Sequence, residues 1–146
     1  MPKTCLIIEN ELGTIEPYLN AISKVMDLLT PTTTDLKSMI RELPTLLRRS
    51  TPDVILLDLM FPEHTQSGNK KANMGGEIFL RMLRSGQIEN LPHNTPVVIL
   101  SGFRGIKDFE EAHRDHVDAV FCKPSAVKNV VRAIIDAADK RTSKDK

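Results

Sequence analysis

The feature that most constrains the fold of this chain is a run of four apolar residues between two aspartates, DVILLD at 53–58. A strand with one face in water would alternate apolar and polar residues, whereas this run is apolar throughout. It is therefore typical of a central strand in a parallel sheet that helices cover on both faces. Three further short apolar runs, at 4–8, 96–100 and 119–122, end in polar residues in the same way.

Helical periodicity fills the segments between these runs. Apolar residues recur at steps of three and four over 15–29 and 36–47, which indicates one buried helix face in each segment. We expect further helices at 77–83, 105–116 and 127–138. Strands that alternate with helices predict an α/β sandwich built around a parallel sheet.

Two more segments complete the predicted order. A fifth strand should lie within 27–34, at an edge of the sheet, because Pro31 cannot donate a hydrogen bond to a neighbouring strand. Residues 63–76 are polar and aperiodic and contain glycine, which indicates a long loop. We expect one domain over 1–140 that includes this loop, followed by a polar tail at 141–146.

The composition limits which binding partners and which cellular compartments we expect for this chain. Lys and Arg number 20 against 19 Asp and Glu, and this net charge of +1 argues against direct nucleic-acid binding by the chain. No apolar run is long enough for a membrane span, and the sequence turns acidic too soon after its start for a signal peptide. Cys5 and Cys122 each lie in an apolar run, so we expect buried thiols in a reducing, cytoplasmic compartment.

Polar residues follow the apolar runs immediately, and this places them together. In an open parallel sheet, ligands bind outside the carboxyl ends of the strands. The residues at these ends are Glu9, Asn10, Asp58, Ser101 and Lys123. Two acids, an amide, a hydroxyl and an amine should therefore meet at one edge of the sheet.

These residue types form a coherent set for phosphoryl chemistry. Glu9 and Asp58 held close together repel each other and favour a hard divalent cation, Mg²⁺ or Mn²⁺. A carboxylate such as Asp58 is also a known nucleophile toward phosphorus. Lys123 and the cation would neutralise charge on the phosphoryl group, and Ser101 could donate a hydrogen bond to it. Because the chain has no glycine-rich phosphate loop, the phosphoryl group must come from a separate donor.

Four motifs carry a resemblance to a known family: LIIENE, DVILLDLMFP, VVILSG and FCKP. They occur in the family's order at the predicted strand ends, with 22 residues from Ser101 to Lys123. From residue 4 to about 138, the sequence resembles the receiver domain of two-component response regulators. The resemblance implies a flavodoxin-like (βα)5 three-layer sandwich with a parallel five-stranded sheet in the order 2-1-3-4-5.

The resemblance also implies a role for each residue of the site. Asp58 would accept a phosphoryl group from a phosphohistidine on a sensor histidine kinase or a histidine phosphotransfer protein. Glu9 and Asn10 occupy the positions of the metal-site acid pair, and the backbone carbonyl of Met60 would complete the protein ligands together with Asp58. Ser101 matches the switch hydroxyl.

The lysine motif and the output of the domain follow from the same resemblance. Lys123 matches the lysine that pairs with the phosphoryl group, and the Lys123–Pro124 peptide resembles one that is cis in the family. We expect self-catalysed phosphotransfer and dephosphorylation but no enzyme acting on a separate substrate. A downstream protein target is expected, and a homodimer is possible. No segment of domain size follows residue 138, so we expect a stand-alone receiver or a fragment of a longer protein, without an output domain on this chain.

Three departures from the family pattern leave an alternative open. Asn10 stands where the second metal-site acid is usual, which should weaken cation binding. Val120 stands at the usual position of the switch aromatic, and the neighbouring Phe121 should point to the opposite face of the sheet. The loop at 63–76 is also longer than is typical, and it could gate access to the site, carry partner specificity or be a tolerated surface insertion. The alternative is a pseudo-receiver, an interaction or dimerisation module that works without phosphate.

A third possibility, a phosphatase of the haloacid dehalogenase type, fits poorly. Such enzymes resemble Asp-x-Asp at the nucleophile, and the residue two positions after Asp58 is Met60. The general acid of that mechanism is therefore missing.

Overall fold

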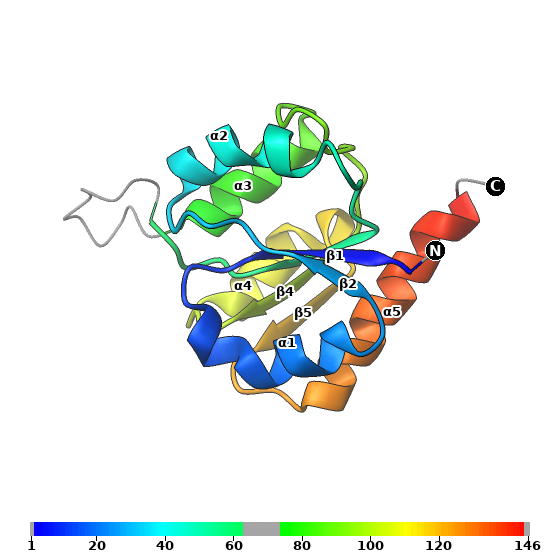
Figure 1. Cartoon of the computed structure of the whole chain (residues 1–146). Helices are drawn as coiled ribbons and strands as arrows, with labels where there is room; N and C mark the ends of the chain where they lie inside the picture. The colour runs from blue at the N-terminus through cyan, green and yellow to red at the C-terminus, as the bar shows by residue number, and fades with distance from the viewer. Residues whose placement is uncertain (1, 63–73, 145–146) are drawn as a thin grey trace.

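The computed structural model describes residues 2–62 and 74–144. Five parallel strands form one sheet in the order β2-β1-β3-β4-β5 (Figure 1). The predicted fold class and strand order are confirmed. The strands are β1 (Thr4–Ile8), β2 (Asp27–Leu29), β3 (Val54–Leu57), β4 (Val97–Ser101) and β5 (Ala119–Cys122).

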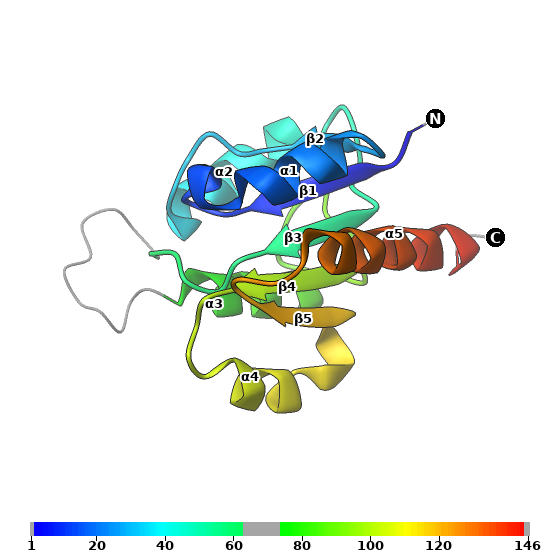
Figure 2. The ribbon, with the colours of Figure 1, turned by 90° about the horizontal axis from the view of Figure 1, so that it is seen from below.

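Helices cover both faces of the sheet and produce three layers (Figures 1 and 2). One face packs against α1 (Glu16–Ser23) and α5 (Val127–Lys144), and the other against α2 (Leu36–Leu46), α3 (Gly75–Arg84) and α4 (Ile106–Ala112). A short 3-10 segment, η1 (Leu12–Ile15), precedes α1, and another, η3 (Arg114–His116), follows α4.

The interior strand β3 shows why its sequence is uniformly apolar. Ile55 and Leu57 pack into the core beneath α2 and α3, whereas Val54 and Leu56 pack into the core beneath α1 and α5. Successive side chains of a strand point to opposite faces, and both faces of this strand are buried. No position in β3 can therefore be polar without placing a polar group in a core.

The strand register aligns the carboxyl ends on which the site depends. Ile8 of β1 pairs with Leu57 of β3, and Ser101 of β4 pairs with Cys122 of β5. The residues that follow β1, β3 and β5 therefore emerge at the same edge of the sheet.

The structure differs from the expected first helix. We expected a helix over 15–29, but α1 ends at Ser23 and the chain then enters β2 at Asp27. The fifth strand thus lies within 27–34, as expected, at an edge of the sheet. The apolar residues after Ser23 fit both the spacing of a helix and that of a strand. The pairing of 27–29 with β1 shows that this segment is a strand. Val25, assigned to the buried helix face, is 51% exposed.

Other helix boundaries also differ from those expected from the sequence. Helix α3 begins at Gly75, so 75–76 belong to a helix and not to the expected loop, whereas 63–73 lie outside the described residues. Helix α5 continues to Lys144 and so enters the expected polar tail at 141–146, of which 145–146 are not described. Over 105–116 the expected helix is divided into α4 and η3.

The two cysteines differ from each other. Cys5 is buried, as expected, but Cys122 is exposed, so the expectation of a buried thiol there was wrong. Cys122 is the last residue of β5, which is an edge strand, and one side of such a strand has no neighbouring strand to cover it. In the part of the chain that the structure describes, no helix is both long enough and apolar enough to cross a membrane.

Candidate functional site

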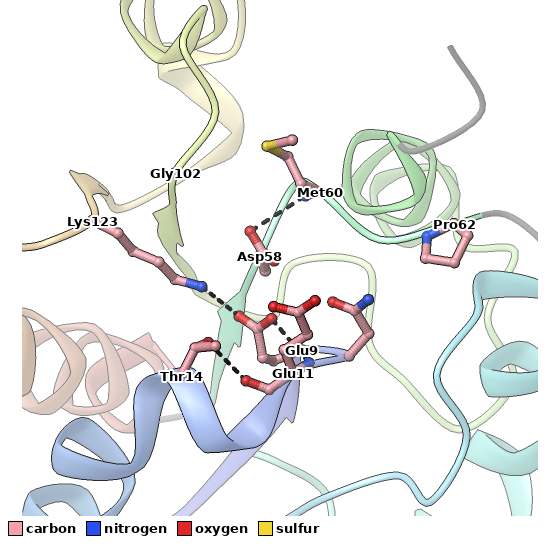
Figure 3. A pocket seen from close by; sticks show the side chains of 9 residues that line it. Glu9, Glu11, Thr14, Asp58, Met60, Pro62, Gly102 and Lys123 are labelled. Carbon is pink, nitrogen blue, oxygen red and sulfur yellow. Dashed lines mark hydrogen bonds and ion pairs between the residues drawn. The ribbon is translucent and has the colours of Figure 1, made fainter. Parts of the chain in front are cut away.

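A cleft of about 400 Å³ opens at the carboxyl edge of the sheet (Figure 3). Five of the six residues that the sequence assigned to the site line this cleft: Glu9, Asn10, Asp58, Met60 and Lys123. They come from the ends of three different strands, which confirms that the fold brings these distant segments together. Further lining residues are Glu11, Thr14, Pro62 and Gly102.

An ion pair joins the ends of β1 and β5 inside the cleft. Lys123 Nζ donates a hydrogen bond to Glu9 Oε2 at 2.9 Å, and the Glu9 side chain is only 4% exposed. The second carboxylate oxygen, Oε1, accepts a hydrogen bond from the backbone N–H of Glu11 at 3.2 Å. The Lys123–Pro124 peptide bond is cis, as expected from the resemblance.

The pKa of Glu9 is raised to about 7, mainly by burial and also by the nearby charge of Asp58, while the hydrogen bond and charge of Lys123 act in the opposite direction. The carboxylates of Glu9 and Asp58 line the cleft together with a single lysine side chain, Lys123. Such a site favours a second cation.

Asp58 is held at the end of β3 by its own backbone. Its N–H donates to the carbonyl oxygen of Ile8 at 2.9 Å, which fixes the start of the loop against β1. Its Oδ1 accepts a weak hydrogen bond from the N–H of Met60 at 3.3 Å. Figure 3 shows the side chain projecting into the cleft between Met60 and Glu9.

The oxygen atoms around Asp58 fit a hard divalent cation. Within the described residues, no cluster of three His, Cys, Asp or Glu side chains is placed to hold a metal ion. A cation at this edge would instead use the carboxylates of Glu9 and Asp58, the amide oxygen of Asn10 and backbone oxygen atoms. Mg²⁺ accepts such a set because it usually keeps several water ligands. Asn10 would be the neutral member of such a ligand set.

Ser101 lies beneath the cleft and not in its wall. Its side chain is fully buried, and its Oγ accepts a hydrogen bond from the N–H of Phe103 at 3.3 Å. Its carbonyl oxygen accepts from the N–H of Lys123 at 2.9 Å, so the ends of β4 and β5 are joined. The adjacent Gly102 lines the cleft. The hydroxyl of Ser101 is therefore not exposed to the cleft.

The aromatic side chain in β5 lies on the face expected from strand alternation. Phe121 packs toward the core beneath α1 and α5, whereas Val120 packs toward the core that includes Phe109 of α4. Of Val120 and Phe121, only Val120 lies on the side of β5 that faces α4. That side therefore carries no aromatic side chain at either of these two positions.

A close backbone contact joins α3 to the loop that carries Asp58. A Cβ atom on Gly76 would lie 2.0 Å from the carbonyl oxygen of Asp58 and 2.5 Å from the Cα of Leu59. The N–H of Gly76 donates to the carbonyl oxygen of Leu59 at 3.1 Å, and that of Gly75 to Phe61 at 2.8 Å. Gly75 and Gly76 lie in the segment expected to be a loop, but in the structure they allow α3 to start directly against the site.

Sequence reasoning missed several lining residues of the cleft. Thr14 lines it from η1, and its hydroxyl donates to the carbonyl oxygen of Glu11 at 2.7 Å. The feature of the sequence that could have identified Thr14 as a lining residue is its position in the first turn after β1. Gly102 was visible only as the residue after Ser101, and its lack of a side chain keeps this wall of the cleft open.

Several solved structures with a similar fold are described as receiver domains. One, described as the signal receiver domain of a Luxo repressor protein from Vibrio parahaemolyticus, has a TM-score of 0.72 at 16% identity and covers 99% of this chain and 96% of that one. A CheY-like response regulator receiver domain from Methanospirillum hungatei JF-1 has a TM-score of 0.68 at 12% identity and covers 99% of both chains. The receiver domain of Francisella response regulator 1452 has a TM-score of 0.66 at 20% identity, with 96% and 98% covered.

This chain has the receiver-domain fold. Neither a sequence model of a protein family nor a curated protein sequence matches it. At such low identities the likeness establishes the fold, and the activity of this receiver-like chain must be argued from its site residues.

Proposed function

We propose that the chain is a phosphoryl-accepting signalling domain of a two-component or phosphorelay system, with Asp58 as the acceptor. The observation that carries this proposal is the position of Asp58. Its carboxylate projects into a cleft that also holds a second carboxylate, Glu9, and an amine, Lys123. The donor would be a phosphohistidine on a sensor kinase or a histidine phosphotransfer protein, and the chain would act in the cytoplasm.

The proposed reaction exchanges one bond to phosphorus for another. A carboxylate oxygen of Asp58 attacks the phosphorus atom and forms an O–P bond, and the P–N bond to the donor histidine breaks. The electron pair of that bond remains on the imidazole nitrogen, which takes up a proton. The product is a mixed anhydride of carboxylic and phosphoric acids on Asp58.

Lys123 and the cation ligands would balance the charge that arrives with the phosphoryl group. Mg²⁺ or Mn²⁺, when bound, supplies positive charge beside the phosphoryl oxygens. In the structure Lys123 is paired with Glu9. A cation next to Glu9 would compete for that carboxylate and leave the amine available to a phosphoryl oxygen. Ser101, once shifted from Phe103, could donate a hydrogen bond to a second oxygen.

The output would be a change in a surface for a downstream protein. Ser101 and Lys123 are the last residue of β4 and the first residue after β5, so their movement would reach the surface formed by α4, β5 and α5. Phosphorylation would shift the population between two arrangements of this surface. Equal binding of a downstream target before and after phosphorylation would contradict this part of the proposal.

A small acyl phosphate tests the proposal without knowledge of the natural kinase. The chain is incubated with acetyl phosphate and Mg²⁺, and the mass of the intact protein is measured. We expect the addition of one phosphoryl group to the natural chain and none to Asp58→Asn, which has nearly the same shape but a weaker nucleophile. No mass gain in the natural chain with any small donor or histidine kinase would overturn the proposal.

Two observations favour the pseudo-receiver as a second candidate. Asn10 removes one negative charge from the cation site, and Val120 provides no aromatic side chain on the face of β5 toward α4. NMR spectra recorded during titration with Mg²⁺ and beryllofluoride separate the candidates. A phosphoacceptor shows shifts of the amide signals around Asp58, whereas a pseudo-receiver shows none.

A further inference from the structure

A pair of histidines lies between α4 and β5, away from the cleft of Asp58. His113 directly follows α4, and His116 is the last residue of η3. Because β5 begins soon afterwards, at Ala119, the pair lies at the amino edge of the sheet, opposite to the cleft (Figure 2). Side chains three residues apart are neighbours on an α-helix, but in a 3-10 turn they eclipse each other. The division of 105–116 into α4 and η3 therefore brings the two imidazole rings together.

Contacts with the rest of the fold hold this pair in place. His113 Nδ1 and His116 Nδ1 are 3.5 Å apart. The ring of His113 packs against that of the buried Phe109, with ring centroids 4.4 Å apart. The N–H of His116 donates to the carbonyl oxygen of His113 at 2.8 Å, and the carbonyl oxygen of His116 accepts from the guanidinium of Arg84. The ring of His113 and the backbone of His116 are thus fixed by the protein itself.

The separation of the two nitrogen atoms fits a tetrahedral zinc ion. Zn²⁺ binds imidazole nitrogen at about 2.0–2.1 Å, so two ligands at the tetrahedral angle lie about 3.3–3.4 Å apart. The observed 3.5 Å is close to this value. Square-planar Cu²⁺ with bonds of the same length would need neighbouring ligands about 2.8–3.0 Å apart. The geometry of the pair therefore favours Zn²⁺.

The surroundings leave the imidazole nitrogen atoms available to a cation. The pKa of His113 is lowered, mainly by burial. Glu77 opposes this shift, whereas the positive charges of His116 and Arg81 add to it. His113 is therefore neutral near pH 7, as a metal ligand must be. The two nearby arginines already have partners, because Arg81 forms an ion pair with Glu77 and Arg84 donates to three backbone carbonyl oxygens.

We propose that His113 and His116 form a binding site for Zn²⁺, with both Nδ1 atoms as ligands. Within residues 2–62 and 74–144, no third His, Cys, Asp or Glu side chain completes a metal cluster, so water would take the remaining positions. The pair lines a hollow of about 420 Å³, which has room for these waters. Each ring would carry its proton on Nε2 and offer the lone pair of Nδ1, so that two neutral rings bind the ion without release of a proton.

This site differs from the cleft of Asp58 in its place and in its metal. Mg²⁺ prefers oxygen ligands, whereas imidazole nitrogen suits Zn²⁺. The pair lies at the edge of the sheet opposite to Asp58, and the proposal holds or fails independently of phosphorylation.

Titration of the full chain with zinc chloride, followed by long-range ¹H–¹⁵N NMR spectra of the histidine side chains, tests the proposal. Cys122→Ser and Asp58→Asn are introduced first, so that neither the exposed thiol nor the carboxylate pair of the cleft competes for the ion. We expect the Nδ1 signals of His113 and His116 to shift together and to saturate, and the signals of the exposed His93 to stay in place. Titration with magnesium chloride should shift none of the three.

Single substitutions identify the ligands and provide the matched control. His113→Gln and His116→Gln should each weaken zinc binding at least about tenfold, because even loss of a group that only supports a metal ligand costs 10–100-fold. His93→Gln should leave the affinity unchanged. Circular dichroism confirms that each variant folds. A shift of only one of the two rings, coordination through Nε2, no saturation at millimolar Zn²⁺, or equal affinity in all three variants would each overturn the proposal.

Discussion

Replacement of Gly76 by alanine should destabilise the fold at the point where α3 meets Asp58. The new Cβ would lie 2.0 Å from the carbonyl oxygen of Asp58 and 2.5 Å from the Cα of Leu59, and contacts below 3.0 Å are essentially never seen. Both atoms belong to the backbone, so neither can rotate away. The start of α3 must therefore move by about 1 Å relative to the loop after β3, which strains the hydrogen bond from Gly76 to Leu59.

Overpacking of this kind costs about 1–3 kcal/mol, and a clash with rigid backbone belongs at the upper end. With an unfolding entropy of roughly 2.1 cal/mol/K per residue, 3 kcal/mol corresponds to a fall in Tm of about 10 °C for a chain of this length. Urea unfolding measures the loss of unfolding free energy, and thermal melting measures the fall in Tm. Gly13→Ala is the matched control, because nothing lies within 4 Å of a Cβ built on Gly13. Equal stability of the two variants would refute the contact between α3 and Asp58.

Three further predictions concern the cation site, a loop and the cysteines. Asn10→Asp adds a carboxylate to the cleft and should tighten Mg²⁺ binding about tenfold, as measured by calorimetric titration; an unchanged affinity would show that residue 10 is not a ligand. Burial opposes ionisation of Glu42, but hydrogen bonds from Thr32 and Thr33 outweigh it and lower its pKa below 4.5. The folded state thus gains stability from this carboxylate above about pH 4.5 and loses it as the pH falls through the lowered pKa. Glu42→Gln should lower the free energy of unfolding at pH 7 and lower it less at pH 3, as measured by urea unfolding, and an equal effect at both pH values would contradict this. Finally, Ellman's reagent should modify Cys122 in the folded protein and Cys5 only after unfolding, because burial raises the pKa of Cys5 to about 12; two reactive thiols in the folded protein would contradict the structure.

The layered fold could be predicted because the sheet is buried on both faces. Uniformly apolar strands such as 54–57 and periodic helices leave few alternatives once they alternate along the chain. Boundaries were harder to predict where two periodicities overlap. Residues 24–29 satisfy a helical spacing and a short strand equally well, and only pairing with β1 selects the strand.

The residues of the site could be predicted by type and position, but their contacts could not. Strand ends in a parallel sheet meet at one edge, which places Glu9, Asp58 and Lys123 together. That Lys123 pairs with Glu9, and that Ser101 is fully buried, depends on side-chain orientations that no spacing encodes. Cys122 was misjudged because an apolar neighbourhood in sequence does not reveal that the strand lies at an edge of the sheet.

The central claim is that Asp58 is the residue that carries a phosphoryl group. Borohydride reduces an acyl phosphate to an alcohol, so treatment after incubation with acetyl phosphate and Mg²⁺ marks the acceptor residue permanently. Peptide mass spectrometry then locates the reduced residue. We predict homoserine at position 58 in the natural chain and at no position when Mg²⁺ or the donor is omitted. Homoserine at another aspartate, with Asp58 intact, would contradict the claim.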